Sequence, residues 1–277
     1  MIAESRATYN GVGTRVLSVS GCGTPVILLH GYADSADTWR AVLARLAAAG
    51  RRALAVDLPG FGRAGRRRSG PMLPQFDSFA DALLDDTGPA VLVGNSLGAA
   101  TAVRAADRRP DVVRALVALD DPINARHWLA RAARYREVPT GFWRTAARLP
   151  IPAVTLRWAT ERGVRRVLYG PGAPADPDVL ARWNRTVASQ AAVANLGRYA
   201  LQYARETAAG HCGVRVSCPT VVVHGARDRI IPVDASRVLH QQIPGSELVV
   251  LPGSGHCPQL DDPDAVARLI VALKGDT

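Results

Sequence analysis

Short apolar runs recur along the chain and are separated by segments in which apolar residues follow helical spacing. Continuous runs rich in Val, Leu and Ile are typical of parallel strands that are buried on both faces. Such runs lie at residues 25–29, 52–57, 90–94, 115–119, 220–224 and 247–251. Helical patterns lie between or after them, at residues 37–49, 76–87, 97–108, 234–243 and 263–273.

This alternation predicts a parallel sheet with right-handed crossover helices. Ahead of it, residues 7–19 alternate loosely around Asn10-Gly11, which is typical of an edge hairpin. We therefore expect an α/β fold with a mostly parallel sheet of about eight strands and helices on both faces. A chain of 277 residues is long enough to bury one such core.

The alternation breaks once, between Asp121 and Thr220. The intervening segment is helical in composition and is cut by several prolines, which predicts a group of short helices inserted after one strand. The expected organisation is a first core segment at 1–122, a helical cap at 123–205 and a second core segment at 206–277.

Composition narrows the class of protein further. The chain is 48% hydrophobic and 21% charged, which are globular values, and its apolar runs are shorter than the ~18 residues that a membrane span needs. The first residues lack the layout of a secretory signal, so a cytoplasmic location is expected. The four cysteines lack Cys-x-x-Cys spacing and predict neither a disulfide framework nor a zinc site.

The net charge of +10 is concentrated in the expected cap, where fourteen arginines stand against four acidic residues. A single lysine, Lys274, and abundant alanine suggest a GC-rich genome. No nucleic-acid-binding motif accompanies the charge, so a nucleic-acid partner is not expected. The excess fits either a solvated surface or an anionic substrate group, as in coenzyme A esters or acyl groups on acidic carrier proteins.

The segment Gly94-Asn95-Ser96-Leu97-Gly98 joins an apolar strand to a helix of small residues. A sharp turn of this kind strains its central residue, and the flanking glycines leave room for the crowded backbone. Ser96 would therefore project from the sheet as a nucleophile. The N–H of Leu97, at the start of the helix, has no partner within the helix and can donate to an oxyanion.

A nucleophilic serine needs a base and an orienting acid, and both residue types follow later strands. Asp228 comes after the strand at 220–224, and His256 comes after the strand at 247–251. Loops at the carboxyl ends of parallel strands are where α/β folds place their chemistry. Asp120 and Asp121, which follow the strand at 115–119, are alternative acids.

The loop after the first parallel strand begins His30-Gly31-Tyr32. Glycine allows a close approach of the backbone, so the N–H of Tyr32 is the expected second oxyanion donor, with Ala33 as its alternative. His30 is expected to order this loop through hydrogen bonds rather than to transfer a proton.

Together, His30-Gly31, the run Asp57 to Gly62, the Ser96 turn, His224-Gly225 with Asp228, and Gly255-His256 resemble an α/β-hydrolase with an inserted cap. The resemblance implies a serine hydrolase that cleaves a carboxylic ester or thioester through an acyl-enzyme. Ser96, Asp228 and His256 would form the triad, and no metal or organic cofactor is expected because no ligand cluster or phosphate-cradling loop is present.

Other members of the family keep several activities open. Epoxide hydrolases and haloalkane dehalogenases carry aspartate where this chain has Ser96, and are disfavoured. Carbon–carbon bond hydrolases of ring-cleavage products resemble it in Asn95-Ser96, and cofactor-free haloperoxidases share the triad. A non-catalytic ligand-binding protein with the same fold is a further alternative.

The expected cap carries nine of the fifteen aromatic residues. Helices need large side chains to dock, but an apolar or aromatic acyl pocket is a second explanation. The expected substrate contacts on this interpretation are Trp128, Phe142 and Trp143.

Overall fold

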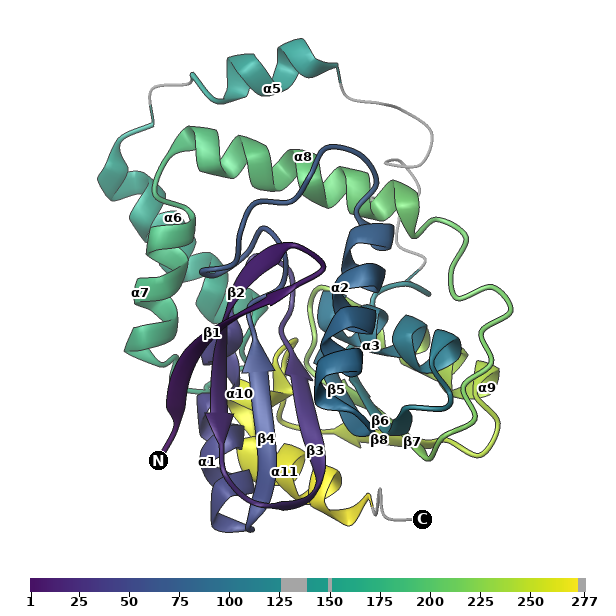
Figure 1. The fold of residues 1–277 in the computed structure, drawn as a ribbon. Helices are drawn as coiled ribbons and strands as arrows, with labels where there is room; N and C mark the ends of the chain where they lie inside the picture. The colour runs from purple at the N-terminus through teal and green to yellow at the C-terminus, as the bar shows by residue number, and fades with distance from the viewer. Residues whose placement is uncertain (126–138, 149–150, 274–277) are drawn as a thin grey trace.

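The computed structural model describes residues 1–125, 139–148 and 151–273, and places one eight-stranded sheet at its centre (Figure 1). The order of the strands is β1-β2-β4-β3-β5-β6-β7-β8. β1 pairs antiparallel with β2, β2 pairs antiparallel with β4, and all other pairs are parallel. The strands are Ala3–Tyr9, Val12–Val19, Cys22–Leu29, Arg51–Val56, Ala90–Asn95, Val113–Leu119, Thr220–Gly225 and Glu247–Leu251, in chain order.

Helices cover both faces of the sheet (Figure 1). One face packs against the pair α1 and α11, preceded by the short 3-10 helix η1, and the other against α2, α3 and α9. The bounds of these helices are Ala36–Trp39 for η1, Arg40–Ala48 for α1, Leu73–Thr87 for α2, Leu97–Arg108 for α3, Val233–Gln242 for α9, Pro258–Asp261 for α10 and Pro263–Ala272 for α11. The predicted α/β class, with its antiparallel edge hairpin, is confirmed.

Local sequence explains why these elements form. In α2 the buried side chains Phe76, Phe79, Ala80, Leu83 and Leu84 recur at helical spacing and form one apolar stripe. The helix ends at Gly88, whose φ of 77° lies in the region that glycine adopts without strain. By contrast, all six residues of β5 are buried, as expected of a central strand covered on both faces.

The described residues between β6 and β7 form four helices, which lie above and beside the sheet in the view of Figure 1. They are α5 (Thr140–Ala146), α6 (Ala153–Val167), α7 (Pro177–Thr186) and α8 (Gln190–Glu206). We call them the cap helices. The expected end of the cap at residue 205 falls in the last turn of α8, and the division of the chain at 122 and 205 stays a prediction.

No helix among the described residues is both long enough and apolar enough to cross a membrane.

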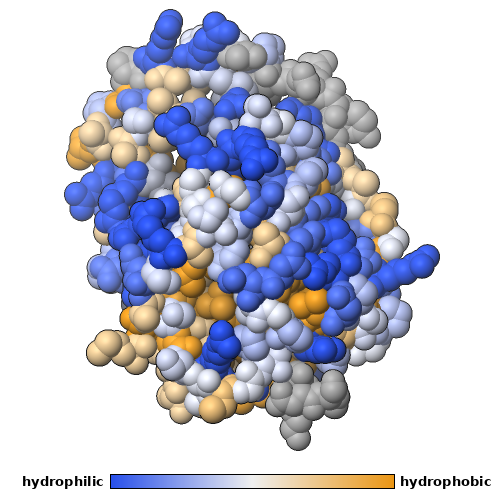
Figure 2. All heavy atoms as spheres, in the orientation of Figure 1, coloured by the Kyte–Doolittle hydropathy of each residue, from blue (hydrophilic) through white to orange (hydrophobic). Residues whose placement is uncertain are grey.

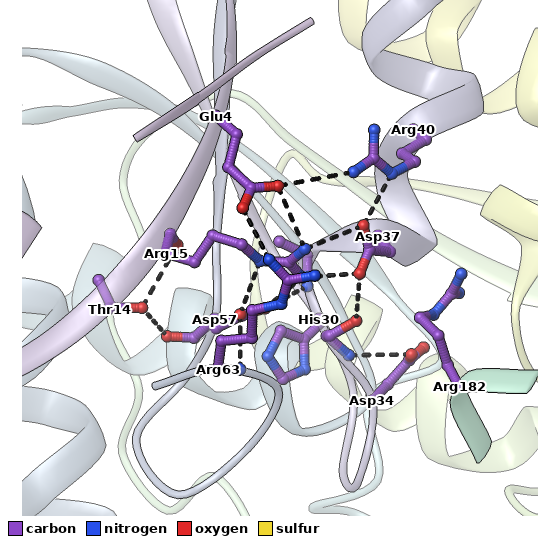
Figure 3. A network of polar contacts seen from close by, with 12 residues as sticks. Glu4, Thr14, Arg15, His30, Asp34, Asp37, Arg40, Asp57, Arg63 and Arg182 are labelled. Atoms are coloured by element: carbon purple, nitrogen blue, oxygen red, sulfur yellow. Dashed lines mark hydrogen bonds and ion pairs between the residues drawn. The ribbon is translucent and has the colours of Figure 1, made fainter. Parts of the chain in front are cut away.

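A buried carboxylate, Asp57, organises the loops beside the first parallel strands (Figure 3). Its oxygens accept hydrogen bonds from Arg15 Nε at 3.0 Å, from the Ala36 N–H at 2.7 Å and from the Arg63 N–H at 2.8 Å. Arg15 also donates to Asp37 at 2.7 Å. Burial opposes the charge of Arg15, but its bonds to Asp37 and Asp57 raise the Arg15 pKa above its usual range. The network therefore joins β2, η1 and the loop after β4.

Replacing Asp57 should destabilise the fold, because a buried charge pair that loses one partner leaves the other without compensation. We expect Asp57→Asn to lower the free energy of unfolding by about 3 kcal/mol, at the lower end of such losses since Asp37 still faces Arg15. Urea unfolding at constant pH measures the loss. The control is Asp264→Asn, which removes an exposed pair with Arg45 and should change stability little. Equal effects of the two substitutions would contradict the role of Asp57.

Candidate active site

Ser96 occupies a strained turn between β5 and α3. Its φ of 53° and ψ of −117° lie where residues with a Cβ are rarely found. The flanking glycines explain how the turn fits: a Cβ on Gly94 would collide with the carbonyl of Gly98, and a Cβ on Gly98 would collide with that of Leu29. The Ser96 N–H donates to the Leu119 carbonyl at 2.8 Å, which ties the turn to the end of β6. The sequence segment thus forms the nucleophile turn that was expected.

The other two predicted catalytic residues lie together in the loops after β7 and β8. The distance from His256 Nδ1 to Asp228 Oδ2 is 2.7 Å, and both side chains are almost fully buried. Asp228 Oδ1 accepts the N–H groups of Ile230 and Ile231, at 2.6 and 3.0 Å. Burial would raise the Asp228 pKa, but the hydrogen bond with His256 and these two N–H groups lower it below its usual range. Asp228 is therefore ionised and positioned to orient the imidazole.

The alternative acids are placed in different roles. Asp120 Oδ1 accepts the Gly225 N–H at 3.0 Å, and complete burial next to Asp228 raises the Asp120 pKa well above its usual range. Burial and the neighbouring charge of Asp228 thus favour the neutral form of Asp120, whereas the contacts of Asp228 favour its ionised form. Asp121 is bonded to the buried ring of His211, with a distance of 3.0 Å from Oδ2 to Nε2. Neither alternative has the contact with His256 that Asp228 has among the described residues.

Asp120, His224 and Asp228 bring one potential metal-ligand atom each to within 4.8 Å of one another. Most of these donor atoms hold hydrogen bonds within the protein. Both oxygens of Asp228 accept the bonds described above, and Nδ1 of His224 lies 2.9 Å from Ser236 Oγ. Asp120 Oδ2 is buried and has no hydrogen-bond partner among the described residues. Burial lowers the His224 pKa, as expected of a neutral ring.

Asn95, the residue before the nucleophile, positions the loop of the base. Its Nδ2 donates to the His256 carbonyl at 2.9 Å, and its Oδ1 accepts from Gln259 Nε2 at 3.2 Å. All three residues are buried. Sequence analysis considered Asn95 only in a comparison with family members, and it missed Gln259. Both contacts join residues that lie about 160 positions apart in the chain, so no local pattern indicates them.

The cap also holds the His256 loop directly. Asp261 Oδ2 accepts the Gly255 N–H at 2.7 Å and the Gly170 N–H, from the segment after α6, at 3.0 Å. The Cys257 N–H donates to the Leu168 carbonyl at 3.0 Å. No sequence motif indicates Asp261. Its carboxylate joins two loops that meet only in the folded chain.

The two predicted oxyanion donors have suitable backbone positions. Leu97 is the first residue of α3, and neither its N–H nor that of Tyr32 bonds to another described residue. His30 orders the loop before Tyr32 through both ring nitrogens: Nε2 accepts from the Leu58 N–H at 2.9 Å, and Nδ1 donates to the Gly31 carbonyl at 2.7 Å. Burial lowers the His30 pKa, so the ring is neutral.

A cavity of about 200 Å³, which we call the catalytic cavity, lies between these loops and the cap. Ser96, His256 and Tyr32 line its floor, and Val167, Leu168 and Trp183 line it from the cap helices and the residue after α6. The cap aromatic that lines it is thus Trp183, which sequence analysis did not single out as a contact.

Two of the three expected substrate contacts do not line the catalytic cavity, and their function in substrate binding stays a prediction. Phe142 is 57% exposed on α5 and does not line the catalytic cavity. Trp143 packs at Gly197 of α8, where an added Cβ would lie 2.8 Å from the indole ring. Trp128 lies outside the described residues. The amphipathic spacing of an isolated segment does not show which aromatic side chain faces the core.

Comparisons with known proteins bear on the family and the fold of this chain. Residues 26–269 match the family model described as alpha/beta hydrolase family. A pimeloyl-[acyl-carrier protein] methyl ester esterase of Chromobacterium violaceum is 32% identical over 260 residues, covering 90% of this chain and 94% of that protein. A putative non-heme haloperoxidase of Mycobacterium phage D29 is 29% identical over 268 residues, covering 93% and 90%.

The fold also matches solved structures. A thermophilic esterase from Thermogutta terrifontis superimposes with a TM-score of 0.72 at 23% identity, covering 98% of this chain and 97% of that one. At this identity the match shows the fold alone.

The geometry separates the two carboxylates next to the base. Asp228→Asn should lower kcat for ester hydrolysis by on the order of 10⁴, because the imidazole loses its orienting anion. Asp120→Asn should have a far smaller effect, since Asp228 and not Asp120 is bonded to His256. Steady-state kinetics of both variants, with circular dichroism to verify folding, measure the difference. A greater loss in Asp120→Asn would place the acid after β6 instead.

Proposed function

The chain belongs to the alpha/beta hydrolase family, and we propose that it is a serine hydrolase that cleaves a carboxylic ester or thioester through an acyl-enzyme. The observation that carries the proposal is the shared cavity. Ser96, on a strained turn, and His256, bonded to the ionised Asp228, both line it. Relatives in this family also include a protein named as a methyl ester esterase, which supports ester chemistry.

The proposed reaction has two halves. Ser96 Oγ attacks the carbonyl carbon while its proton passes to His256 Nε2, and the N–H groups of Tyr32 and Leu97 stabilise the oxyanion. When the tetrahedral intermediate collapses, the bond to the leaving alcohol or thiol breaks and that group takes the proton from His256. Water then attacks the acyl-enzyme, gives a proton to His256, and releases the carboxylic acid as Ser96 regains its proton.

The cap offers a place for the acyl chain. An apolar groove of about 350 Å³ runs between α6, α7 and α8, and shares Val167, Leu168 and Trp183 with the catalytic cavity. Ala159, Gly163 and Val193 also line it. Because the two spaces share a wall, an acyl chain on Ser96 can extend from the catalytic cavity into this acyl groove. We propose an aliphatic acyl substrate on this basis.

The first test concerns the nucleophile. Ser96→Ala should abolish hydrolysis of p-nitrophenyl esters and acyl thioesters while leaving the melting temperature nearly unchanged, because it removes one hydroxyl and little volume. A fluorophosphonate probe should label the unsubstituted protein and fail to label the variant. Activity of the variant near that of the unsubstituted protein would reject Ser96. Labelling without turnover of any ester or thioester would favour a ligand-binding protein or a carbon–carbon bond hydrolase.

The second test concerns the acyl groove. Each buried methylene contributes about 0.8 kcal/mol, so kcat/KM should rise about fourfold per carbon while the chain lengthens within the groove. Gly163→Leu should cancel that rise for long chains, because a Cβ at Gly163 meets no neighbouring atom and the new side chain can fill the groove. Hydrolysis of an acetyl ester is the control, because it measures the reaction of Gly163→Leu without a long acyl chain in the groove.

Gly141→Leu on α5 is the matched control for the groove. Gly141 is also a helical glycine with open space at its Cβ position, but it does not line the acyl groove. We expect this variant to keep the chain-length profile of the unsubstituted protein. If Gly163→Leu keeps that profile as well, the acyl chain does not lie in the groove.

A further inference from the structure

Four arginines surround a second cavity, formed where the loop after β4 runs beside α8 (Figure 1). Arg66, Arg67 and Arg68 come from the loop, and Arg198 comes from α8. Gln202 of α8 donates to the Gly70 carbonyl at 2.9 Å and holds the two walls together. The cavity measures about 630 Å³, and we call it the Arg67 cleft. Strongly hydrophilic side chains cover the upper half of this face in Figure 2.

The positive charge of the Arg67 cleft has no counter-charge within it. No acidic residue lines the cleft, and the guanidinium groups of Arg66, Arg67 and Arg198 make no hydrogen bond or ion pair with the described residues. The nearby carboxylate of Glu206 is occupied by the N–H groups of Met72 and Leu73. The cleft therefore differs from a surface laced with ion pairs.

Two other basic cavities of the described chain show the contrast. The cavity lined by Arg63 and Arg182 also contains Asp34 and Asp37. The cavity lined by Arg162 and Arg165 contains Glu161, which accepts a hydrogen bond from Arg157. Among these three cavities, the Arg67 cleft is the one lined by arginines without a carboxylate.

The arginines of the cleft are held in place before any ligand binds. The guanidinium carbons of Arg67 and Arg198 each lie 4.3 Å from the centre of the Tyr199 ring. Arg67 also packs closely on Gly60, and its burial lowers its pKa. Stacking uses the face of a guanidinium and leaves its N–H edge available. Guanidinium N–H edges left free in this way suit the oxygen atoms of phosphate groups.

Tyr32 connects the catalytic cavity to α8, the helix that carries Arg198 and Tyr199 of the Arg67 cleft. Tyr32 lines the catalytic cavity, and its hydroxyl donates to the Leu196 carbonyl of α8 at 2.6 Å. Burial raises the Tyr32 pKa above its usual range, and the charges of Arg67 and Arg198 act on the same hydroxyl. A ligand that fills both spaces thus has its charged end on the arginines and its reactive end at Ser96.

We propose that the Arg67 cleft binds the phosphate groups of a coenzyme A thioester whose acyl group reaches Ser96. The proposal rests on the proposed function, because it names the leaving group of that reaction. The guanidinium groups of Arg66, Arg67 and Arg198, which have no hydrogen-bond or ion-pair partner among the described residues, match a ligand with several phosphate groups better than one with a single carboxylate. The guanidinium group of Arg68 donates to the Asn10 carbonyl at 3.1 Å. The cleft volume falls within the ~300–1,000 Å³ range of small-molecule sites.

Binding is tested separately from catalysis. Isothermal titration calorimetry on the full-length Ser96→Ala protein compares coenzyme A, pantetheine, which lacks the diphosphate and nucleotide, and inorganic pyrophosphate. We expect coenzyme A to bind at least about tenfold more tightly than pantetheine, and pyrophosphate to compete with it, since hydrogen bonds to charged groups contribute about 1.5–3 kcal/mol each. Equal affinities for coenzyme A and pantetheine would reject the proposal.

Matched substitutions locate the site. Arg67→Gln combined with Arg198→Gln should weaken coenzyme A binding at least about tenfold at low salt, with a smaller loss near 1 M salt, where charges are screened within ~3 Å. Arg144→Gln combined with Arg148→Gln removes the same charge from exposed cap positions outside the cleft and should leave affinity unchanged. Equal effects of the two pairs would show non-specific attraction and reject the site.

The remaining outcomes are also decisive. In the protein with Ser96 intact, Arg67→Gln combined with Arg198→Gln should raise KM for an acyl-coenzyme A more than it raises KM for the matching acyl-pantetheine. An acidic carrier protein that binds while coenzyme A does not would replace the proposed ligand and overturn it. Ester hydrolysis without any coenzyme A binding would reject coenzyme A as the ligand of the Arg67 cleft and leave the proposed serine hydrolase activity standing. Coenzyme A binding without any ester or thioester hydrolysis would reject the proposed activity and leave the binding site standing.

Discussion

The close backbone packing around Ser96 is the constraint on which the rest of the site depends. Gly94 and Gly98 lie so close to neighbouring carbonyl groups that no larger residue fits, and Ser96 is held at a φ of 53° between them. Backbone strain of this kind persists only where the surrounding structure holds the strained residue in place. The buried β5 and the bond from the Ser96 N–H to Leu119 provide that support. The same turn leaves the Leu97 N–H, at the start of α3, without a hydrogen-bond partner among the described residues.

The catalytic base is supported from two sides, and this connects the cap to the core. Asn95 holds the His256 carbonyl from the end of β5, and Asp261 joins the His256 loop to the segment that follows α6. A displacement of the cap would therefore disturb the same loop that carries the imidazole. Residues of α6 and α7 that line the catalytic cavity are thus linked to the position of His256, although they lie far apart in the sequence.

Charge in this protein is handled in two ways. Where carboxylates are present, as at Asp57, arginines form buried networks that join loops (Figure 3). In the Arg67 cleft, arginines are arranged around Tyr199 without an acidic partner among the described residues. The excess of arginines in the sequence of residues 123–205 is consequently not uniform in its effect: part of it covers exposed helix surface, and part borders cavities next to the catalytic residues.

The sequence by itself determined the sheet, the crossover helices and the positions of Ser96, Asp228 and His256 at the ends of strands. These features follow from local patterns: apolar runs, helical spacing, and glycines at a strained turn. Tertiary structure alone decided that Asp228 rather than Asp120 meets His256, and that the pKa values of the two carboxyl groups shift in opposite directions, because burial and neighbouring charge set a pKa. It also decided that Trp183, and not Phe142 or Trp143, lines the catalytic cavity. Which side of a cap helix faces the core depends on residues more than a hundred positions away, and no local pattern records that contact.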